Sequence, residues 1–154
     1  MQIVRTETLA QRTGAYYVRI QAMALRHQIT PEQEFDEHDT PQTRYIVIYD
    51  GVLPVATGRL YAIDTERVML GRIVVLEEYR GRGLGRTVVT ESERWAAELG
   101  FRTAVLEART EKQGFYEKLG YTADPARIIC GETFTCIHME KPLISLPQSQ
   151  CCRC

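Results

Sequence analysis

The chain lacks the features that would place it in a membrane or outside the cell. No run approaches the roughly 18 consecutive apolar residues of a membrane-spanning helix, and the N-terminus has no charged segment followed by an apolar one. Its five cysteines are an odd number and give neither a disulfide framework nor a zinc-finger spacing. An excess of charge of one sign is also absent, since 19 basic residues face 20 acidic ones. We therefore expect a cytoplasmic protein with reduced thiols and with no metal, nucleic acid or membrane as a partner.

The chain has the length of one ordinary domain. With 154 residues it can bury about two thirds of its unfolded surface. We expect one domain over residues 1–143 and a flexible C-terminal tail over residues 144–154. For the three cysteines of that tail, the alternatives to a disordered segment are lipidation and binding of a soft metal. Cys130 and Cys136 fall in an alternating segment, where we expect small buried hydrophobic side chains.

Hydrophobic periodicity and turn residues predict an alternation of strands and helices. Apolar side chains at helical spacing predict helices over residues 16–28, 84–99 and 111–119. Alternating or continuous apolar runs predict strands over residues 1–8, 44–49, 53–63, 68–76, 103–106, 121–130 and 132–140. Residues 30–43 lack an apolar period and are predicted to form a loop or a broken helix.

A loop of glycine and arginine is the most informative segment. The residues Arg-Gly-Arg-Gly-Leu-Gly-Arg at positions 80–86 follow the apolar run 71–76 and lead into the amphipathic stretch that begins at Leu84. Glycine lets consecutive backbone N–H groups converge on one point, the helix that follows adds the positive end of its dipole, and arginine supplies full charge. The segment is therefore predicted to bind an anion, and a pyrophosphate is the natural ligand.

The spacing distinguishes this segment from two other phosphate-binding loops. A Walker loop needs a lysine and a hydroxyl residue after its last glycine, where this chain has Arg86 and Thr87. A dinucleotide-binding loop that starts at Gly81 needs its third glycine at position 86. The pattern Arg-x-x-Gly-x-Gly over residues 80–85 instead resembles the Q/R-x-x-G-x-G/A motif of the GNAT superfamily of N-acetyltransferases.

Two further segments carry the resemblance, which covers roughly Met1 to Leu143. Residues 114–121 read Gly-Phe-Tyr-Glu-Lys-Leu-Gly-Tyr and look like the family's F-Y-E-K-L-G-F segment after the cofactor-binding helix. Residues 34–39 read Glu-Phe-Asp-Glu-His-Asp and are similar to an acidic segment of one small subgroup. Arg26 and His27 stand where that subgroup usually has Glu-Gln, so the subgroup does not identify the substrate.

The resemblance implies a fold and a cosubstrate site. The fold is of the α/β (α+β) class, with a mixed six- or seven-stranded sheet flanked by about four helices. The family binds acetyl-CoA, and its loop holds the pyrophosphate, a role that carries over to Arg80, Gly81, Arg82, Gly83, Leu84, Gly85 and Arg86. The strand before the loop hydrogen-bonds pantetheine, a role that carries over to Ile73, Val74 and Val75, with the thioester carbonyl near the N–H of Val75. A plain sheet-core role for the same three side chains is compatible with backbone binding.

The resemblance also implies a reaction. The expected activity is transfer of an acetyl group from the cosubstrate acetyl-CoA to a primary amine of a small molecule by direct attack, without a metal. Tyr116 matches the tyrosine that often protonates the CoA thiolate. A phenol with a pKa of about 10 stays protonated at neutral pH and can donate to a thiolate whose conjugate acid lies near 8.5. The alternative is that Tyr116 only packs beside Phe115 and Leu119.

Several points stay open at the level of sequence. Glu107 and His138 are candidates for the general base, whereas His27 and His38 are expected at the surface. A homodimer is compatible with the sequence. The alternative functions are an acyl-CoA-binding sensor without turnover, and an acyltransferase that acts on a protein or an aminoacyl-tRNA, or that uses another acyl-CoA.

The five carboxylates of residues 30–43 have two interpretations. They can form the wall of a site for a cationic acceptor such as a polyamine, an amino sugar or lysine, or they can form a solvated acidic loop. The residues concerned are Glu32, Glu34, Asp36, Glu37 and Asp39.

Overall fold

The computed structural model describes residues 1–144 of the 154 residues. The cysteines of the expected tail, at positions 151, 152 and 154, lie outside the described residues. The described chain forms two compact units, Met1–Tyr61 with Leu70–Ser92, and Ala62–Met69 with the described residues from Glu93 to Ile144. No helix among the described residues is long and apolar enough to cross a membrane.

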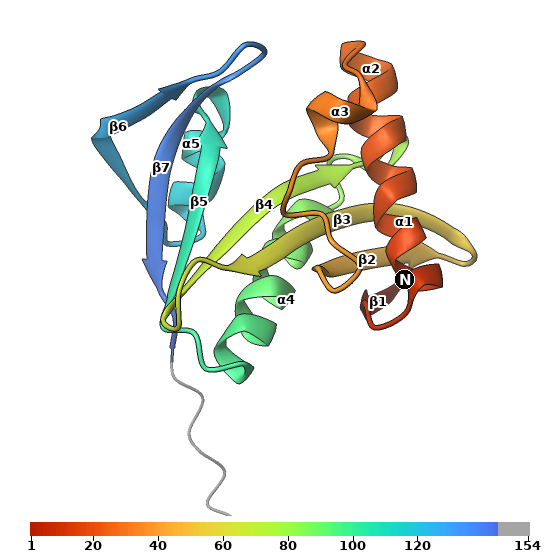
Figure 1. The fold of residues 1–154 in the computed structure, drawn as a ribbon, viewed down its shortest axis with the longest axis horizontal. Coiled ribbons are helices and arrows are strands. Elements are labelled where there is room, and N and C mark those ends of the chain that lie inside the picture. Colours follow the sequence, from red (N-terminus) through yellow and green to blue (C-terminus); the bar gives the residue numbers. More distant parts are fainter. Residues whose placement is uncertain (145–154) are drawn as a thin grey trace, which may run out of the picture. The chain divides into compact units, whose positions relative to one another are not determined.

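Four strands follow one another in space as they do in sequence. The order is β1-β2-β3-β4, and β1 pairs antiparallel with β2, as β2 does with β3 (Figure 1). Four consecutive residues of β2, from Tyr45 to Ile48, are buried, which is expected of a strand covered on both faces. The strand bounds are Gln2–Arg5 for β1, Arg44–Asp50 for β2, Leu53–Ala62 for β3 and Arg67–Val75 for β4.

The N-terminal helix is longer than its apolar stripe predicted. It begins with α1 (Leu9–Arg19), continues through one π-helical stretch (Ile20–Ala24) and ends with α2 (Leu25–His27). The start at Leu9 comes from a capping box, in which the side chains of Thr8 and Gln11 each accept a hydrogen bond from the other's backbone N–H. A further short helix, α3 (Pro31–Glu34), falls in the segment predicted to be a loop or broken helix.

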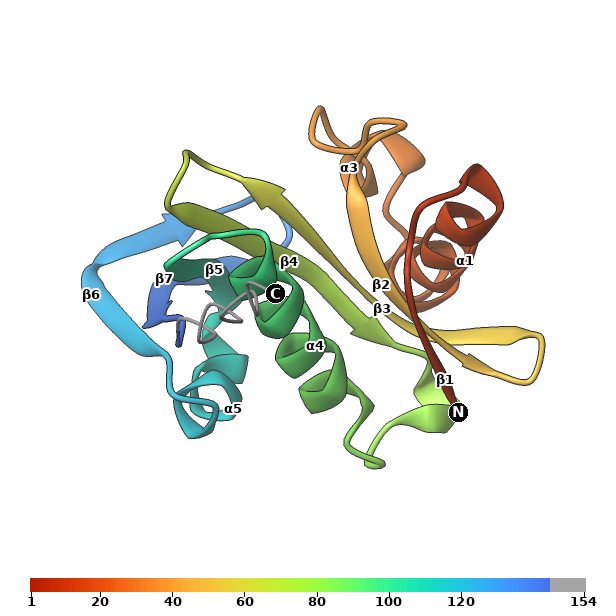
Figure 2. The same ribbon diagram turned by 90° about the horizontal axis from the view of Figure 1, so that it is seen from below.

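Helices cover both faces of these strands. On one face, Ala15 of α1 packs in a buried cluster with Tyr45 and Val47. On the other face lies α4 (Leu84–Glu98), as Figure 2 shows. A Cβ atom added at Gly58 of β3 would lie 2.5 Å from Cγ1 of Val88, so only glycine lets α4 approach the strand this closely.

The second unit contains the remaining three strands. They are β5 (Thr103–Arg109), β6 (Thr122–Cys130) and β7 (Thr135–Pro142), in the order β5-β7-β6 with antiparallel pairing. The helix α5 (Gln113–Lys118) lies between β5 and β6 in sequence. Cys130 is exposed and Cys136 is half-buried, so the expectation of a buried hydrophobic side chain is wrong for Cys130.

Candidate active site

The Gly/Arg loop adopts the backbone that its glycines make available. Gly81 and Gly83 both have φ of +77°, a left-handed conformation that L side chains seldom adopt. A Cβ at either position would meet no atom within 4 Å. The backbone hydrogen bonds of α4 begin with the one that the N–H of Thr87 donates to the carbonyl of Gly83 at 3.1 Å. The loop thus ends on a helix N-terminus, where backbone N–H groups point forward and favour an anion.

Four contacts fix the entry to this loop. Nε of Arg80 donates to the carbonyl of Val75 at 3.4 Å, which ties the loop to the end of β4. The hydroxyl of Tyr79 donates to Oδ2 of Asp50 at 2.7 Å. The guanidinium carbon of Arg82 lies 4.8 Å from the centre of the Tyr79 ring, and Nη2 donates to the carbonyl of Glu78 at 3.3 Å. Residues 80–83 are nevertheless exposed, so their backbone is accessible to a ligand.

The segment expected to bind pantetheine follows an unusual backbone conformation. Ile73, Val74 and Val75 are half-buried residues at the end of β4. Arg72, directly before them, has φ of +49° although it carries a side chain. Its Nε donates to the carbonyl of Glu34 at 3.1 Å. The segment 73–75 therefore directly follows a left-handed residue, Arg72, whose side chain is hydrogen-bonded to the end of α3.

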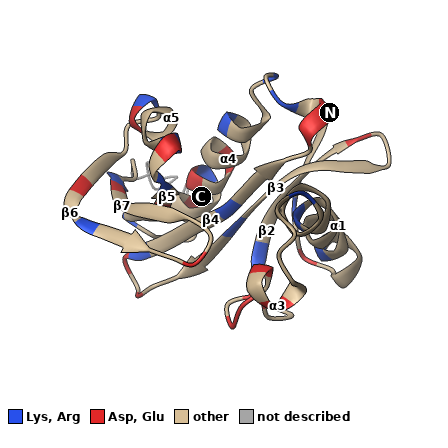
Figure 3. Ribbon diagram, turned by 90° about the horizontal axis from the view of Figure 1, so that it is seen from above, with Lys and Arg blue, Asp and Glu red and all other residues tan. Residues whose placement is uncertain are grey.

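The acidic segment forms a network with arginines from α1, β3 and β4. The side chain of Arg19 is fully buried and makes ion pairs of 3.0 Å with Glu34 and 2.6 Å with Asp39. Nη1 of Arg59 lies 2.8 Å from Asp36 and 3.0 Å from Asp39. Figure 3 shows the basic residues on β3 and β4 and the acidic residues on α3. We call the six residues Arg19, Glu34, Asp36, Asp39, Arg59 and Arg72 the ion-pair network.

This network corrects both interpretations of the acidic segment for Glu34 and Asp39. The side chains of Glu34 and Asp39 are only 3% and 6% exposed, so they are neither solvated nor open to a cationic acceptor. Burial alone would raise the pKa of Asp39, but hydrogen bonds from Arg19 and Tyr45 outweigh it and hold that pKa far below its usual value. Glu32 and Glu37 are the members of the segment that remain exposed.

Tyr116 lies on α5, in the second unit, whereas the loop and residues 73–75 lie in the first. Its ring contacts Phe115 and Tyr121 edge-on, with centroids 4.9 and 6.0 Å away. Burial raises the pKa of Tyr116 to about 12, against a smaller lowering by the charge of Arg109. The phenol is therefore protonated throughout the physiological range.

The two candidate bases face each other across a strand pair. Glu107 of β5 is exposed and pairs in register with His138 of β7. His138 is buried, with Nε2 at 3.1 Å from Nη1 of Arg127 and 2.9 Å from Oε1 of Glu140. Neither His27 nor His38 is fully at the surface, since both are half-buried, and the ring of His38 stacks on Tyr61 at 3.9 Å. Residues 1–144 contain no group of three or more His, Cys, Asp or Glu side chains that could hold a metal ion.

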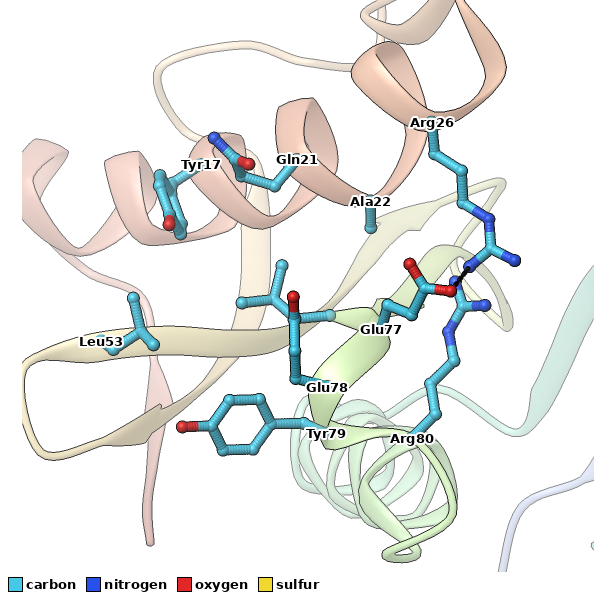
Figure 4. A pocket seen from close by; sticks show the side chains of 10 residues that line it. Tyr17, Gln21, Ala22, Arg26, Leu53, Glu77, Glu78, Tyr79 and Arg80 are labelled. Atoms are coloured by element: carbon cyan, nitrogen blue, oxygen red, sulfur yellow. Dashed lines mark ion pairs between the residues drawn. The ribbon is translucent and has the colours of Figure 1, made fainter.

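A cavity of about 440 Å³ adjoins the loop within the first unit (Figure 4). It extends from Leu76, which follows the pantetheine segment, to Arg80 of the loop. Both signs of charge line it, and the guanidinium of Arg26 lies 3.8 Å from Glu77. Sequence reasoning did not identify this cavity, because α1, α2 and β3 contribute to it from distant positions. Its lining residues are Tyr17, Gln21, Ala22, Arg26, Leu53, Leu76, Glu77, Glu78, Tyr79 and Arg80.

Comparison with known proteins identifies the class. A family model described as the acetyltransferase (GNAT) family matches residues 9–121. YjcF of Bacillus subtilis (strain 168), an uncharacterised protein named as an N-acetyltransferase, is 33% identical over 121 residues, which are 79% of this chain and 85% of YjcF. The crystal structure of an inferred N-acetyltransferase from Lactobacillus plantarum matches with a TM-score of 0.87 and 31% identity, over 93% of this chain and 98% of that one. The chain belongs to the acetyltransferase (GNAT) family.

A more distant structure supports the fold alone. An aminoglycoside 6'-N-acetyltransferase crystallised with coenzyme A matches with a TM-score of 0.75 at 16% identity, over 96% of this chain and 99% of that one. The expected fold class, a mixed sheet with about four helices, is confirmed with seven strands among the described residues. Family membership supports acyl transfer as the reaction class.

Proposed function

We propose that the protein is an acetyl-CoA-dependent N-acetyltransferase that acetylates a primary amine of a small molecule by direct attack. The observation that carries this proposal is the loop at residues 80–86, which combines two left-handed glycines, exposed arginines and a helix N-terminus. These features suit a diphosphate, because amide N–H groups, a helix dipole and guanidinium groups all favour negative charge.

We infer one binding surface for the pyrophosphate of acetyl-CoA and one for its pantetheine. Arg80 to Arg86 would bind the pyrophosphate, in the open space beside Gly81 and Gly83. Backbone groups of Ile73, Val74 and Val75 would hydrogen-bond pantetheine, while their half-buried side chains pack in the unit. The bond between Arg80 and the carbonyl of Val75 joins the two surfaces, which supports one continuous ligand.

The reaction needs few groups beyond this positioning. The neutral amine attacks the thioester carbon, and a backbone N–H near Val75 stabilises the negative charge that develops on oxygen. The C–S bond then breaks, the nitrogen gives a proton to solvent water, and the thiolate gains one from a donor that solvent reprotonates. We assign the latter proton to Tyr116, because a phenol with a pKa of about 12 is protonated whenever the thiolate forms.

The acceptor is a small molecule in this proposal. A cavity of about 440 Å³ falls in the size range of small-molecule sites, and it adjoins both proposed cosubstrate surfaces. A nearly balanced net charge of −1 gives no support to a nucleic-acid acceptor. Cytoplasmic acetyl-CoA would supply the donor.

An acceptor panel tests the activity. The protein is incubated with acetyl-CoA and a set of polyamines, amino sugars, amino acids and peptides, and free thiol is followed together with product mass. We expect thiol release that depends on one class of amine. Tight CoA binding without thiol release across the panel would support the acyl-CoA sensor instead.

Substitution of Tyr116 tests the proton donor. In Tyr116→Phe the ring still packs against Phe115 and Tyr121, so we expect CoA affinity to be unchanged and kcat to fall about 100-fold. Calorimetry with CoA and steady-state kinetics measure the two quantities. A wild-type kcat would mean that the tyrosine only packs.

A further inference from the structure

The ion-pair network ends at the residue that precedes the pantetheine segment. Arg72 contributes its guanidinium to the network through Oδ2 of Asp36 at 3.2 Å and the carbonyl of Glu34 at 3.1 Å. Its backbone is the left-handed residue from which Ile73 continues the strand. One residue therefore joins the network to the segment at which we propose that the cosubstrate binds.

The backbone conformation of Arg72 needs support from its surroundings. An L residue with φ of +49° is strained, and such residues persist where neighbouring contacts fix them. Glycine would adopt this conformation without strain, yet the chain has arginine here. The guanidinium contacts the carbonyl of Glu34 and the carboxylate of Asp36, and such contacts can offset the strain of this φ.

The partners of Arg72 are themselves immobilised. Asp36 accepts from Nη1 and Nη2 of Arg59 at 2.8 and 3.2 Å. Glu34 accepts from the fully buried Arg19 at 3.0 Å, and α3 is held by the capping pair Thr30 and Gln33. The position of the Arg72 side chain is thus set by charges in α1 and β3 rather than by solvent.

We propose that Arg72 is a positioning residue, which through Glu34 and Asp36 holds the backbone of Ile73 to Val75 in the geometry that binds the pantetheine arm of acetyl-CoA. This inference rests on the proposed function. It assigns Glu34 and Asp36 a role in cosubstrate affinity in place of acceptor recognition, through their contacts with a strand distant in sequence.

Two substitutions at position 72 separate this role from its alternatives. Both Arg72→Ala and Arg72→Gly remove the guanidinium, but only glycine accepts the left-handed φ without strain. We expect the Kd for CoA to rise about tenfold in Arg72→Ala and distinctly less in Arg72→Gly. Equal weakening in both variants would indicate a direct ligand contact and would overturn the positioning role. Wild-type affinity in both would overturn it as well.

A control variant tests for general loss of stability. Tyr45→Phe removes the 2.5 Å hydrogen bond that Tyr45 donates to Asp39, a member of the network that does not contact Arg72. We expect it to lower the melting temperature while changing the CoA Kd less than about twofold. Loss of CoA affinity in proportion to lost stability in all three variants would contradict the proposal.

A measurement without ligand distinguishes failure of this inference from failure of the proposed function. Amide chemical shifts of Ile73 to Val75 in the free protein should move in Arg72→Ala and remain near the wild-type values in Tyr45→Phe. If these shifts move but the wild-type protein binds no CoA, the proposed function is wrong and the cosubstrate part of the inference fails with it. If the wild-type protein binds CoA and the shifts do not move, the positioning role alone is overturned.

Discussion

Two groups of arginines in the first unit use the same side chain in opposite ways. Arg19 and Arg59 have side chains that are 0% and 5% exposed, and carboxylates lie within 3.0 Å of their guanidinium nitrogens. Arg82 and Arg86 are exposed, and the contacts of Arg82 are with a carbonyl and a ring rather than a carboxylate. Carboxylates inside the protein neutralise the charges of the first group, whereas the charges of the second group are exposed to solvent.

The difference shows that composition does not reveal where charge is available. A balanced total of 19 basic and 20 acidic residues is compatible with a strongly basic loop, because several acidic residues are bound elsewhere by arginine. Buried ion pairs contribute to the specificity of one arrangement more than to net stability, but breaking one is costly. Exposed charges contribute little to stability, so folding does not account for the arginines of the loop.

The largest expected effect is on the stability of the buried group. Asp39→Ala removes a carboxylate that accepts from Arg19, Arg59 and Tyr45, and it leaves two buried guanidinium groups short of a partner. We expect the free energy of unfolding to fall by about 3–5 kcal/mol, measured by urea denaturation. The control is Glu32→Ala, an exposed carboxylate of the same segment, with an expected change within about 0.5 kcal/mol. Equal losses of unfolding free energy in the two variants would mean that the buried ion pairs contribute no more to stability than an exposed carboxylate does.

The second largest expected effect is on CoA binding at the loop that carries the exposed arginines. Gly83→Asp places a negative charge at the proposed diphosphate site, and we expect the CoA Kd to rise about tenfold to 100-fold by calorimetry. Gly51→Asp is the matched control, because Gly51 also has a positive φ (+60°) and open space around its Cβ, in the β2–β3 turn. Gly51→Asp should weaken stability similarly and leave CoA binding unchanged. Unaltered CoA affinity in Gly83→Asp would refute the loop assignment.

A smaller effect concerns pH and the buried group. The pKa of Asp36 is lowered because hydrogen bonds and charge from Arg59 outweigh the opposing effect of burial. A lowered folded-state pKa means that the stabilisation is present above the unfolded pKa of about 3.9 and is lost as the pH falls below it. Between pH 6 and pH 3.5, the free energy of unfolding measured by urea denaturation should therefore fall more for the wild type than for Asp36→Asn. Parallel losses in the two proteins would mean that Asp36 is not coupled to folding.

The smallest expected effect is that of salt concentration. It should act on the exposed arginines and leave the buried ones almost unaffected. Between about 0.05 and about 0.5 M monovalent salt, screening of exposed arginines should weaken CoA binding several-fold. The stability difference between the wild type and Asp39→Ala should change little, because buried pairs are screened much less. Calorimetry and urea denaturation over the same salt series measure both. A salt-independent CoA affinity would argue against diphosphate binding by the loop.

The sequence predicted local structure well, but it did not predict the ion pairs between distant segments. All seven strands and the loop before α4 lie where periodicity and glycine spacing placed them, within a few residues. The N-terminal helix begins at Leu9 rather than Tyr16 because Thr8 and Gln11 form a capping box, a signal that was legible in the sequence.

The ion-pair network could not be predicted from the sequence. Its acidic members lie within residues 34–39, but Arg19, Arg59 and Arg72 come from three other elements, and only the folded chain brings them together. The left-handed φ of Arg72 could not be predicted either. A positive φ is expected of glycine, and the residue before Arg72 is Gly71. Local patterns thus predict a candidate anion site, but not which charges are already neutralised inside the protein.

The contact between Gly58 and Val88 constrains attempts to alter this protein by saturation mutagenesis. Most substitutions at position 58 would push α4, and with it the helix end that follows the loop, away from β3. Such variants would score as inactive in a screen although no ligand-binding group had been changed. A combinatorial library should therefore either hold position 58 constant or vary it together with position 88, so that a methyl group gained on the strand can be matched by one lost on the helix.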